Sequence, residues 1–572
     1  MSRVLLLTCP GPYPEHPPDR DGIDQYGMRF TKHQELFQLP IEYPFHLGQH
    51  FIARNLDAEV TVLDAPLPAQ LALELARPAR PEIVGISFPA VLIPRALEAA
   101  RLVRRLAPRA KIVLGGHGVA CLGKGRIPRN RAALPPVDVA PRSPARAQLD
   151  ELELCADEVC QGEGIAFVRE LLGLDPAAPV DGRLPPSGIM RPFGLPLVPM
   201  RNMISLAPAM GCSGGCDFCC TGAFFGGRRR VILEPAQAVR AIREQLGRVR
   251  PGQRAVGVLM DEDLLADPGW FRPFGELLAG DALVRERHFT YTAFASVSAL
   301  DQYSVEELLR YRLSNVWIGV ETMREGTGVP YLDRKRRGSE AATFARLHGA
   351  GITTTASFIL GWDFHDRETL RAEVERFLEL QPTMAQVMPL IPAPGTRLWA
   401  AMAAAGRLDP VERWEDLHYY GRNFRYRHAS VDEIWALEDE TERRLFVEQG
   451  PAFLKMTEIY LDGAERFRGH ADPCLDDMTR VFAGFLEDLR PTRPSIIALA
   501  PSAPRRRAWR AVTRLERLLG PPSLAARARG AALQAYNRLR LAGMGPGRPY
   551  QPVPQRTVYS RGRVVESAWG GP

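Results

Sequence analysis

The sequence predicts an α/β protein with three parts: a Rossmann-like domain, a partial (β/α)6 barrel and a helical C-terminal domain. Short apolar runs alternate with helical stretches over residues 1–190 and again over 201–425, as is typical of parallel sheets covered by helices. Beyond residue 426, long helical patterns replace the strands. A chain of 572 residues is also long for one hydrophobic core, so two or three domains are expected.

The composition is that of a globular protein, with 45% hydrophobic and 24% charged residues. A net charge of +7 is small for so long a chain, and no nucleic-acid partner is expected. No apolar run reaches the 18 residues of a membrane span, and the N-terminal apolar run breaks at Pro10, too early for a signal peptide. Nine cysteines without a secretion signal fit a reducing cytoplasm.

In the first domain, four short apolar runs are predicted to be strands: 4–8, 59–63, 83–88 and 111–114. Ligands of doubly wound parallel sheets bind at the carboxyl ends of the strands. Two of these ends are small or glycine-rich, with Ser87 at one and Gly115 and Gly116 ahead of His117 at the other. Small residues leave room there for a flat ligand or a nucleotide tail.

Two segments of this domain are rich in proline. Residues 121–157 also contain many Arg and Ala residues and are predicted to form an exposed loop. Residues 174–200 are predicted to link the first domain to the second. Glu163 stands just ahead of a predicted helix over 165–172, where an acidic residue favours the helix N-terminus.

The second domain contains six predicted strands: 203–208, 255–260, 289–295, 316–320, 352–360 and 386–390. Helices are predicted over 236–246, 305–311, 340–348 and 369–380. Six βα units fit a partial parallel barrel, whose chemistry gathers at the carboxyl ends of its strands. Polar residues stand at three of those ends: Asp261, Glu262 and Asp263 after the second strand, Ser296 after the third and Glu321 after the fourth.

Three cysteines follow the first barrel strand at C-x3-C-x2-C spacing, in a glycine-rich loop: Cys212, Cys216 and Cys219. Three thiolates can hold three irons of a 4Fe–4S cluster, which leaves the fourth iron for a substrate or cofactor. The alternative is one zinc ion with Cys220 as the fourth ligand. Adjacent cysteines chelate one tetrahedral ion poorly, and the chain has no second C-x2-C-like unit, so the cluster is favoured.

This spacing, with Phe218 just before the third cysteine, resembles the signature of the radical S-adenosylmethionine (SAM) family. The resemblance implies that the three cysteines bind the cluster and that Phe218 lies near the adenine of SAM. It also implies SAM contacts from Asp261, Asp263, Ser296 and Glu321. The family's G-G-E triplet is absent, so the individual carboxylate is not identified, and each acidic residue could instead cap the following helix.

Three segments of the first domain, 81–87, 113–117 and 160–164, occur in that order ahead of the cysteine motif. Together they resemble the cobalamin-binding domain of the cobalamin-dependent radical SAM enzymes. The resemblance implies that cobalamin lies near Ser87, Gly115, Gly116 and His117. The D-x-H-x-x-G motif is absent after the first strand, so no histidine of that motif is expected on cobalt. His117 is expected to pack against the cofactor or the next domain. The alternative is a Rossmann-like domain that binds nothing.

The third domain, 426–572, has predicted helices over 431–449, 452–467 and 475–489, followed by two basic helices over 505–519 and 525–541. In the first basic helix an apolar face is formed by Trp509, Val512, Leu515 and Leu519. Such a helix either lies on an anionic membrane or packs its apolar face on the core, and the second is favoured. Residues 543–572 are rich in Gly and Pro and are predicted to be poorly ordered.

The resemblance implies a cobalamin-dependent radical SAM enzyme, with a 4Fe–4S cluster, SAM and cobalamin as cofactors and an external electron donor such as flavodoxin or ferredoxin. The expected reaction is methylation of an unactivated carbon through a 5′-deoxyadenosyl radical. One alternative is ring formation, rearrangement or carbon–carbon coupling without methyl transfer. Another is a cobalamin-binding sensor with a structural cluster. The substrate is a small molecule or a lipid, no catalytic side chain is identified, and the expected location is cytoplasmic, with peripheral contact at the inner membrane face as an option.

Overall fold

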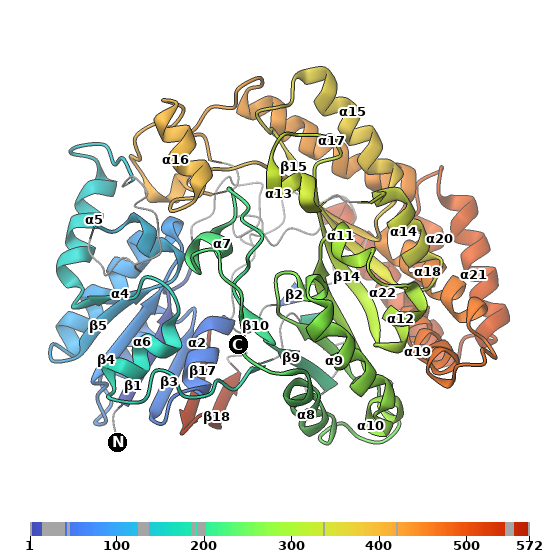
Figure 1. Ribbon diagram of the computed structural model, residues 1–572, viewed down its shortest axis with the longest axis horizontal. Coiled ribbons are helices and arrows are strands. Elements are labelled where there is room, and N and C mark those ends of the chain that lie inside the picture. The colour runs from blue at the N-terminus through green and yellow to red at the C-terminus, as the bar shows by residue number, and fades with distance from the viewer. Residues whose placement is uncertain are drawn as a thin grey trace.

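The computed structural model describes residues 3–13, 41–42, 46–123, 137–185, 189–190, 202–335, 338–418, 421–543 and 554–569. Within these ranges the chain forms two large sheets, each of seven strands. The two sheets lie beside each other with the loop before helix α7 (Cys220–Phe224) between them, and a group of helices packs on the far side of the second sheet (Figure 1). The predicted α/β architecture is therefore confirmed.

The first sheet contains five parallel strands in the order β3-β1-β4-β5-β6. Their bounds are β1 (Arg3–Thr8), β3 (Glu59–Asp64), β4 (Ile83–Ser87), β5 (Lys111–Gly115) and β6 (Glu158–Val159). The helices of this domain are α2 (Leu47–Arg54), α3 (Pro68–Leu75), α4 (Ile93–Leu106), α5 (Pro144–Cys155) and α6 (Gly164–Leu171). The chain runs from β1 to β3 on one side and returns to β4 on the other. Ligands of doubly wound sheets bind at such a reversal.

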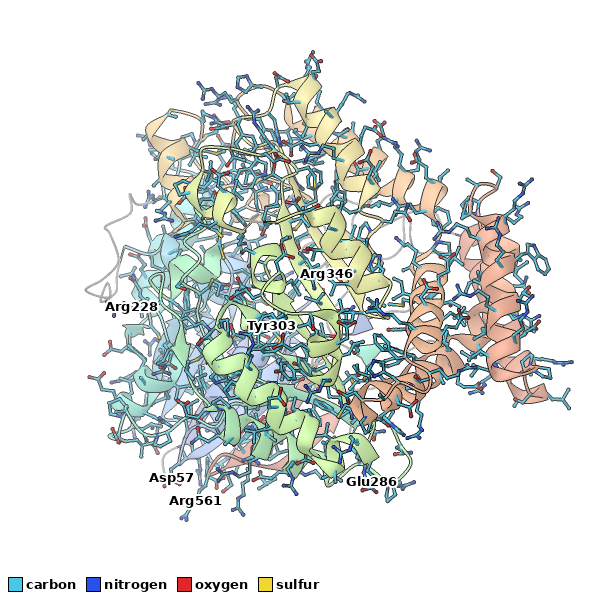
Figure 2. The ribbon with its side chains drawn as sticks, turned by 45° about the vertical axis from the view of Figure 1, so that its right-hand side comes forward. Asp57, Arg228, Glu286, Tyr303, Arg346 and Arg561 are labelled. Atoms are coloured by element: carbon cyan, nitrogen blue, oxygen red, sulfur yellow. The ribbon has the colours of Figure 1, made fainter. Side chains whose placement is uncertain are left out.

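A C-terminal hairpin extends this sheet, although residues 543–572 were predicted to be poorly ordered. The strands β17 (Gln555–Ser560) and β18 (Arg563–Trp569) pair with each other, and β17 pairs antiparallel with β3. Arg561 and Gly562 form the turn at φ +47° and +72°, and Arg561 reaches Asp57 at the same edge of the molecule (Figure 2). The β-branched and aromatic residues Thr557, Val558 and Tyr559 were the available strand signal.

Helix α5 corrects the prediction of an exposed loop over 121–157. Ser143 caps the helix by accepting a hydrogen bond from the Arg146 backbone, and Pro144 occupies its first turn. Three apolar side chains of the helix are buried in the core of the first domain: Ala145, Leu149 and Leu152. The proline content suggested a loop, but a proline at a helix start is compatible with a helix. Residues 124–136 lie outside the described residues.

The second sheet contains six parallel strands in chain order, which confirms the predicted partial barrel. They are β9 (Met203–Leu206), β12 (Val256–Leu259), β13 (Thr290–Ala295), β14 (Leu313–Glu321), β15 (Thr353–Leu360) and β16 (Met384–Pro389). The short β7 (Arg183–Leu184) pairs antiparallel with β9 at the edge. The covering helices include α8 (Pro235–Leu246), α9 (Pro268–Gly280), α12 (Val305–Arg310), α14 (Glu340–His348) and α15 (Arg367–Glu379).

The C-terminal helices pack against the barrel. They are α17 (Val431–Gln449), α18 (Ala452–Arg466), α19 (Pro473–Leu489), α20 (Arg493–Leu499), α21 (Arg505–Leu519) and α22 (Leu524–Gly543). In α21, Val512 and Leu515 are buried, which matches the favoured prediction for this helix, but Trp509 lies off this face and is 54% exposed. Across the described part of the chain, no helix combines the length and apolar character needed to cross a membrane.

Candidate functional site

The three-cysteine loop lies at the carboxyl end of the first barrel strand, between β10 (Ala209–Met210) and α7. Cys212 Sγ accepts a hydrogen bond from the Gly214 backbone at 3.2 Å, and Cys219 Sγ accepts one from Gly222 at 3.5 Å. Gly211 has a φ of +75°, and a Cβ there would lie 2.2 Å from the Arg228 carbonyl oxygen. Only glycine fits this close backbone approach.

The geometry of the loop fits a 4Fe–4S cluster. A Cβ on Gly214 would lie 3.2 Å from Cys212 Sγ and 3.8 Å from Cys216 Sγ, so the bare glycine leaves a cradle beside two of the sulfurs. All three motif thiols are partly buried. Among the described residues, no group of three or more His, Cys, Asp or Glu side chains is close enough to hold a single metal ion.

Two arginines from distant elements hold the outside of this loop. Arg334, in α13 (Pro330–Lys335), donates to the Gly214 carbonyl oxygen at 3.0 Å. Arg397, the first residue of α16 (Arg397–Ala404), donates to the Gly215 carbonyl oxygen and pairs with Asp217 at 2.6 Å. Sequence reasoning missed both, because they lie more than a hundred residues beyond the motif and no local pattern marks them.

Glu321 ends β14 and forms an ion pair inside the barrel. Its Oε1 lies 3.0 Å from Lys335 Nζ, and their side chains are 9% and 23% exposed. Burial by itself would lower the pKa of Lys335, but the negative charges of Glu321 and Cys216 outweigh it and raise the pKa. Lys335 therefore carries a positive charge beside the cysteine loop. The sequence analysis identified Glu321 but not its partner.

The carboxylates after β12 take different roles. Asp263 accepts hydrogen bonds from the Ser296 backbone at 3.1 Å and from its hydroxyl at 3.0 Å, so two predicted SAM contacts lie together. Asp261 is fully buried and pairs with Arg229 at 2.6 Å. Burial raises the pKa of both Glu262 and Asp263.

Aromatic side chains close one side of the cysteine loop. The ring of Phe218 meets Trp362 edge to face, with ring centroids 5.6 Å apart, and lies 6.2 Å from Tyr331. The Trp362 indole donates to the Glu321 carbonyl oxygen at 3.2 Å. Phe218 therefore ties the cysteine loop to the strand end that carries Glu321. These aromatic side chains lie on the side of the loop where the adenine of SAM was predicted to lie.

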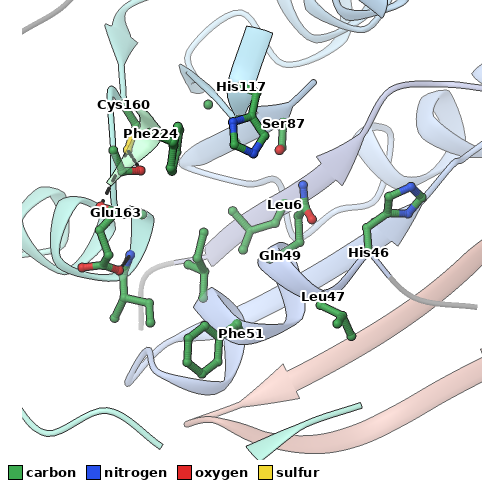
Figure 3. Close-up of a pocket in the computed structure, with 18 of the residues that line it drawn as sticks. Leu6, His46, Leu47, Gln49, Phe51, Ser87, His117, Cys160, Glu163 and Phe224 are labelled. Atoms are coloured by element: carbon green, nitrogen blue, oxygen red, sulfur yellow. Dashed lines mark hydrogen bonds between the residues drawn. The ribbon is translucent and has the colours of Figure 1, made fainter. Parts of the chain in front are cut away.

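A cavity of about 760 Å³ joins the two halves of the molecule (Figure 3). All four residues that were predicted to lie near cobalamin line it: Ser87, Gly115, Gly116 and His117. On the barrel side it is lined by Gly211, Thr221, Phe224, Asp261 and Glu262. The carboxyl ends of the first sheet thus face the cysteine loop across one continuous space. Its volume is that of a typical cofactor pocket.

Gly116, His117 and Glu163 each form part of the cavity wall. Gly116 has a φ of +85°, and a Cβ there would lie 2.7 Å from Ser87 Oγ. The ring of His117 packs on Phe224 with ring centroids 4.8 Å apart, so His117 contacts the next domain as expected (Figure 3). Glu163 caps α6 by accepting hydrogen bonds from two backbone N–H groups, which confirms its predicted place at the helix start. Helix α2, which the sequence analysis missed, supplies much of the remaining wall.

Comparison with known proteins found solved structures that superpose in part on this chain. No protein-family model matches the sequence, and no curated protein is similar to it at a significant level. The radical SAM methyltransferase TsrM from Kitasatospora setae, solved with cobalamin and a 4Fe–4S cluster, superposes with a TM-score of 0.49 at 15% identity, over 78% of this chain and 89% of TsrM.

Two further solved structures are similar in part. The cobalamin-dependent SAM radical enzyme OxsB, solved with aqua-cobalamin, superposes with a TM-score of 0.48 at 12% identity, over 95% of this chain and 85% of OxsB. Methylornithine synthase, PylB, gives a TM-score of 0.26 at 15% identity, over 46% of this chain and 69% of its own.

Proposed function

We propose that this chain is a cobalamin-dependent radical SAM enzyme that methylates an unactivated carbon. The observation that carries the proposal is the continuous cavity between the carboxyl ends of the first sheet and the three-cysteine loop. A cofactor on the first sheet and SAM on the loop would then share one space with the substrate. Such shared access is what methyl transfer to a substrate radical requires.

The roles of the residues follow from their positions. Cys212, Cys216 and Cys219 would hold the cluster, with Gly214 leaving room beside the sulfurs. When bound, the cluster and SAM supply a radical that removes hydrogen from carbon, and cobalamin supplies the methyl group. Lys335 places a positive charge beside the loop, where it would attract the carboxylate of SAM. Phe218 and Trp362 exclude water.

The first test is the metal content of protein purified without oxygen from cobalamin-fed cells. We expect four irons, four sulfides and one cobalt per chain, and loss of the iron but not the cobalt in Cys216→Ala. Cys220→Ala is the matched control, because this adjacent thiol lies outside the motif, and it should keep most of its iron. Iron without cobalt would remove the methyl-donor mechanism. Zinc without iron would overturn the whole proposal.

The second test identifies the reaction. With SAM, a reductant and a substrate library of small molecules and lipids, methylation yields S-adenosylhomocysteine together with 5′-deoxyadenosine. The appearance of 5′-deoxyadenosine alone would instead indicate rearrangement, ring formation or carbon–carbon coupling. A cobalamin sensor with a structural cluster would yield neither product. Flavodoxin or ferredoxin should replace the chemical reductant, since we also propose an external electron donor.

A further inference from the structure

The segment 490–548 concentrates the positive charge of the protein. It contains thirteen Arg residues and a single acidic residue, Glu516, so its net charge exceeds the +7 of the whole chain. The rest of the chain is therefore net negative. Helices α20 and α21 of this segment lie at the right-hand edge of the molecule in Figure 1, and the first sheet lies at the left. The basic segment is thus a feature separate from the cavity and the cysteine loop.

The side of helix α21 that faces α18 is neutralised by acidic side chains. Arg507 pairs with Glu458 at 2.5 Å, and Arg514 pairs with both Asp462 and Glu465 at 2.7 Å. All three acidic residues belong to α18. Between these ion pairs, the small and apolar side chains of α21 are buried against the neighbouring helices. These contacts attach α21 to the protein and satisfy two of its arginines.

The opposite side of α21 carries arginines without partners. Arg506, Arg510 and Arg517 follow one another at intervals of four and seven residues, so they share one face of the helix. All three are exposed, and within the part of the chain that the structure describes their guanidinium groups make no ion pair or hydrogen bond. Three positive charges therefore face outward along about 16 Å of helix.

An exposed tryptophan lies on the same face. Trp509 follows Arg506 by three residues and is 54% exposed, and among the described side chains it is the one Trp or Phe in an exposed position. Leu524, at the start of α22, is 82% exposed. Tryptophan is enriched at membrane–water interfaces, where its ring meets the apolar boundary and its N–H meets the headgroups. Arginines beside exposed apolar side chains are typical of surfaces that bind anionic membranes.

We propose that the outer face of α21, formed by Arg506, Trp509, Arg510 and Arg517, binds the surface of an anionic membrane. Charge complementarity supports this occupant, because anionic headgroups would supply the partners that the three arginines lack. Each arginine would raise the binding constant about fivefold. Proteins that bind single-stranded nucleic acids stack several aromatic side chains on successive bases, and this face has one. The proposal goes beyond the proposed function and needs none of its cofactors.

Sedimentation of the full chain with sucrose-loaded vesicles tests the proposal. We expect binding to phosphatidylcholine vesicles that contain about 30% phosphatidylglycerol, and little binding to phosphatidylcholine alone. Raising the salt concentration from about 0.1 M to about 0.5 M should release the protein, because salt screens the attraction. Equal binding to both kinds of vesicle, or binding to neither, would overturn the proposal. Binding of a labelled DNA duplex without binding to vesicles would instead assign the face to nucleic acid.

A triple variant locates the binding surface. Changing Arg506, Arg510 and Arg517 to Gln should weaken binding to the anionic vesicles about a hundredfold. The matched control removes the same charge from three exposed arginines of the first domain that make no ion pair among the described residues: Arg80, Arg105 and Arg109. The control should bind nearly as well as wild type. Equal losses in the two triple variants would show that net charge alone drives binding, which contradicts a site on α21.

The aromatic contribution is tested separately. Trp509→Ala keeps every charge and should weaken binding to the anionic vesicles about tenfold, because it removes apolar surface that membrane contact would bury. Unchanged binding would refute the role of Trp509. Circular dichroism confirms that each variant is folded. The iron and cobalt contents of all variants should equal those of wild type, so failure of the membrane proposal is distinguished from failure of the proposed function.

Discussion

The ammonium of Lys335 lies 3.0 Å from Oε1 of Glu321, at the end of barrel strand β14. Glu321 adopts a φ of +64°, a conformation that is uncommon for residues other than glycine and is concentrated at functional sites. A Cβ on Gly319 would lie 2.7 Å from Glu321 Oε1 and 3.4 Å from Lys335 Nζ, so a glycine also makes room for this pair. The ion pair is therefore built into the strand end rather than formed on an open surface.

Lys335→Met should destabilise the cofactor-free protein by about 3 kcal/mol, because it leaves the Glu321 carboxylate buried without its partner. The double variant Lys335→Met/Glu321→Gln removes both charges and should recover most of that loss. Urea unfolding of the two single variants and the double variant measures the coupling. Losses that simply add would show that the pair is not coupled. Lys335→Met should also abolish SAM cleavage.

Gly116→Ala should destabilise the first domain by about 1–3 kcal/mol, because φ is +85° there and the new methyl would meet Ser87 and Phe88. Gly115→Ala is the matched control. A Cβ at Gly115 meets nothing within 4 Å, so thermal unfolding should change little. Gly115→Leu extends into the cavity and should weaken cobalamin binding about tenfold. Equal melting temperatures for the two alanine variants would contradict this account of Gly116.

Gly214→Ala should reduce the iron content of the protein without unfolding it. The added methyl would lie 3.2 Å from Cys212 Sγ, on the side of the loop where the cluster must fit. Gly222→Ala serves as the control, because a Cβ there meets nothing within 4 Å and alanine favours the helix α7. Iron and sulfide analysis after reconstitution compares the two variants. Full iron content in Gly214→Ala would mean that the cluster lies elsewhere.

Asp64 should stabilise the protein in a pH-dependent way. Burial raises its pKa, but hydrogen bonds from His46 and His50 outweigh burial and lower the pKa from 3.8 to about 2. Because the folded pKa lies below the unfolded one, this stabilisation is present above pH 4 and is lost as the pH falls toward 2. It amounts to about 2 kcal/mol. The stability difference between wild type and Asp64→Asn should therefore shrink between pH 5 and pH 2.

The control for this titration is Asp57→Asn, since Asp57 is 68% exposed at the hairpin edge (Figure 2). Its stability difference from wild type should be small and nearly independent of pH. Chemical unfolding at several pH values, with circular dichroism as the signal, measures both variants. A difference for Asp64→Asn that stays constant down to pH 2 would show that Asp64 keeps an ordinary pKa.

Local patterns predicted most of the barrel. Strands such as β15 (Thr353–Leu360), buried along its whole length, and helices such as α14 follow from apolar runs and periodicity within ten residues. The same patterns failed where a segment depends on a distant partner. Helix α5 was mistaken for a loop because its proline content dominated, and the hairpin β17–β18 was missed because its pairing strand β3 lies about five hundred residues earlier.

The amino-acid sequence alone determined the cysteine spacing, the order of the strands along the chain and the small residues at the carboxyl ends of the first sheet, because these are properties of neighbouring residues. The tertiary structure decided which charges meet. Lys335 reaches Glu321, Arg229 reaches Asp261, and His46 and Tyr559 join the group around Asp64. Such pairs form because helices, loops and the C-terminal hairpin fold over the strand ends that carry Glu321, Asp261 and Asp64, and no short sequence pattern records that folding.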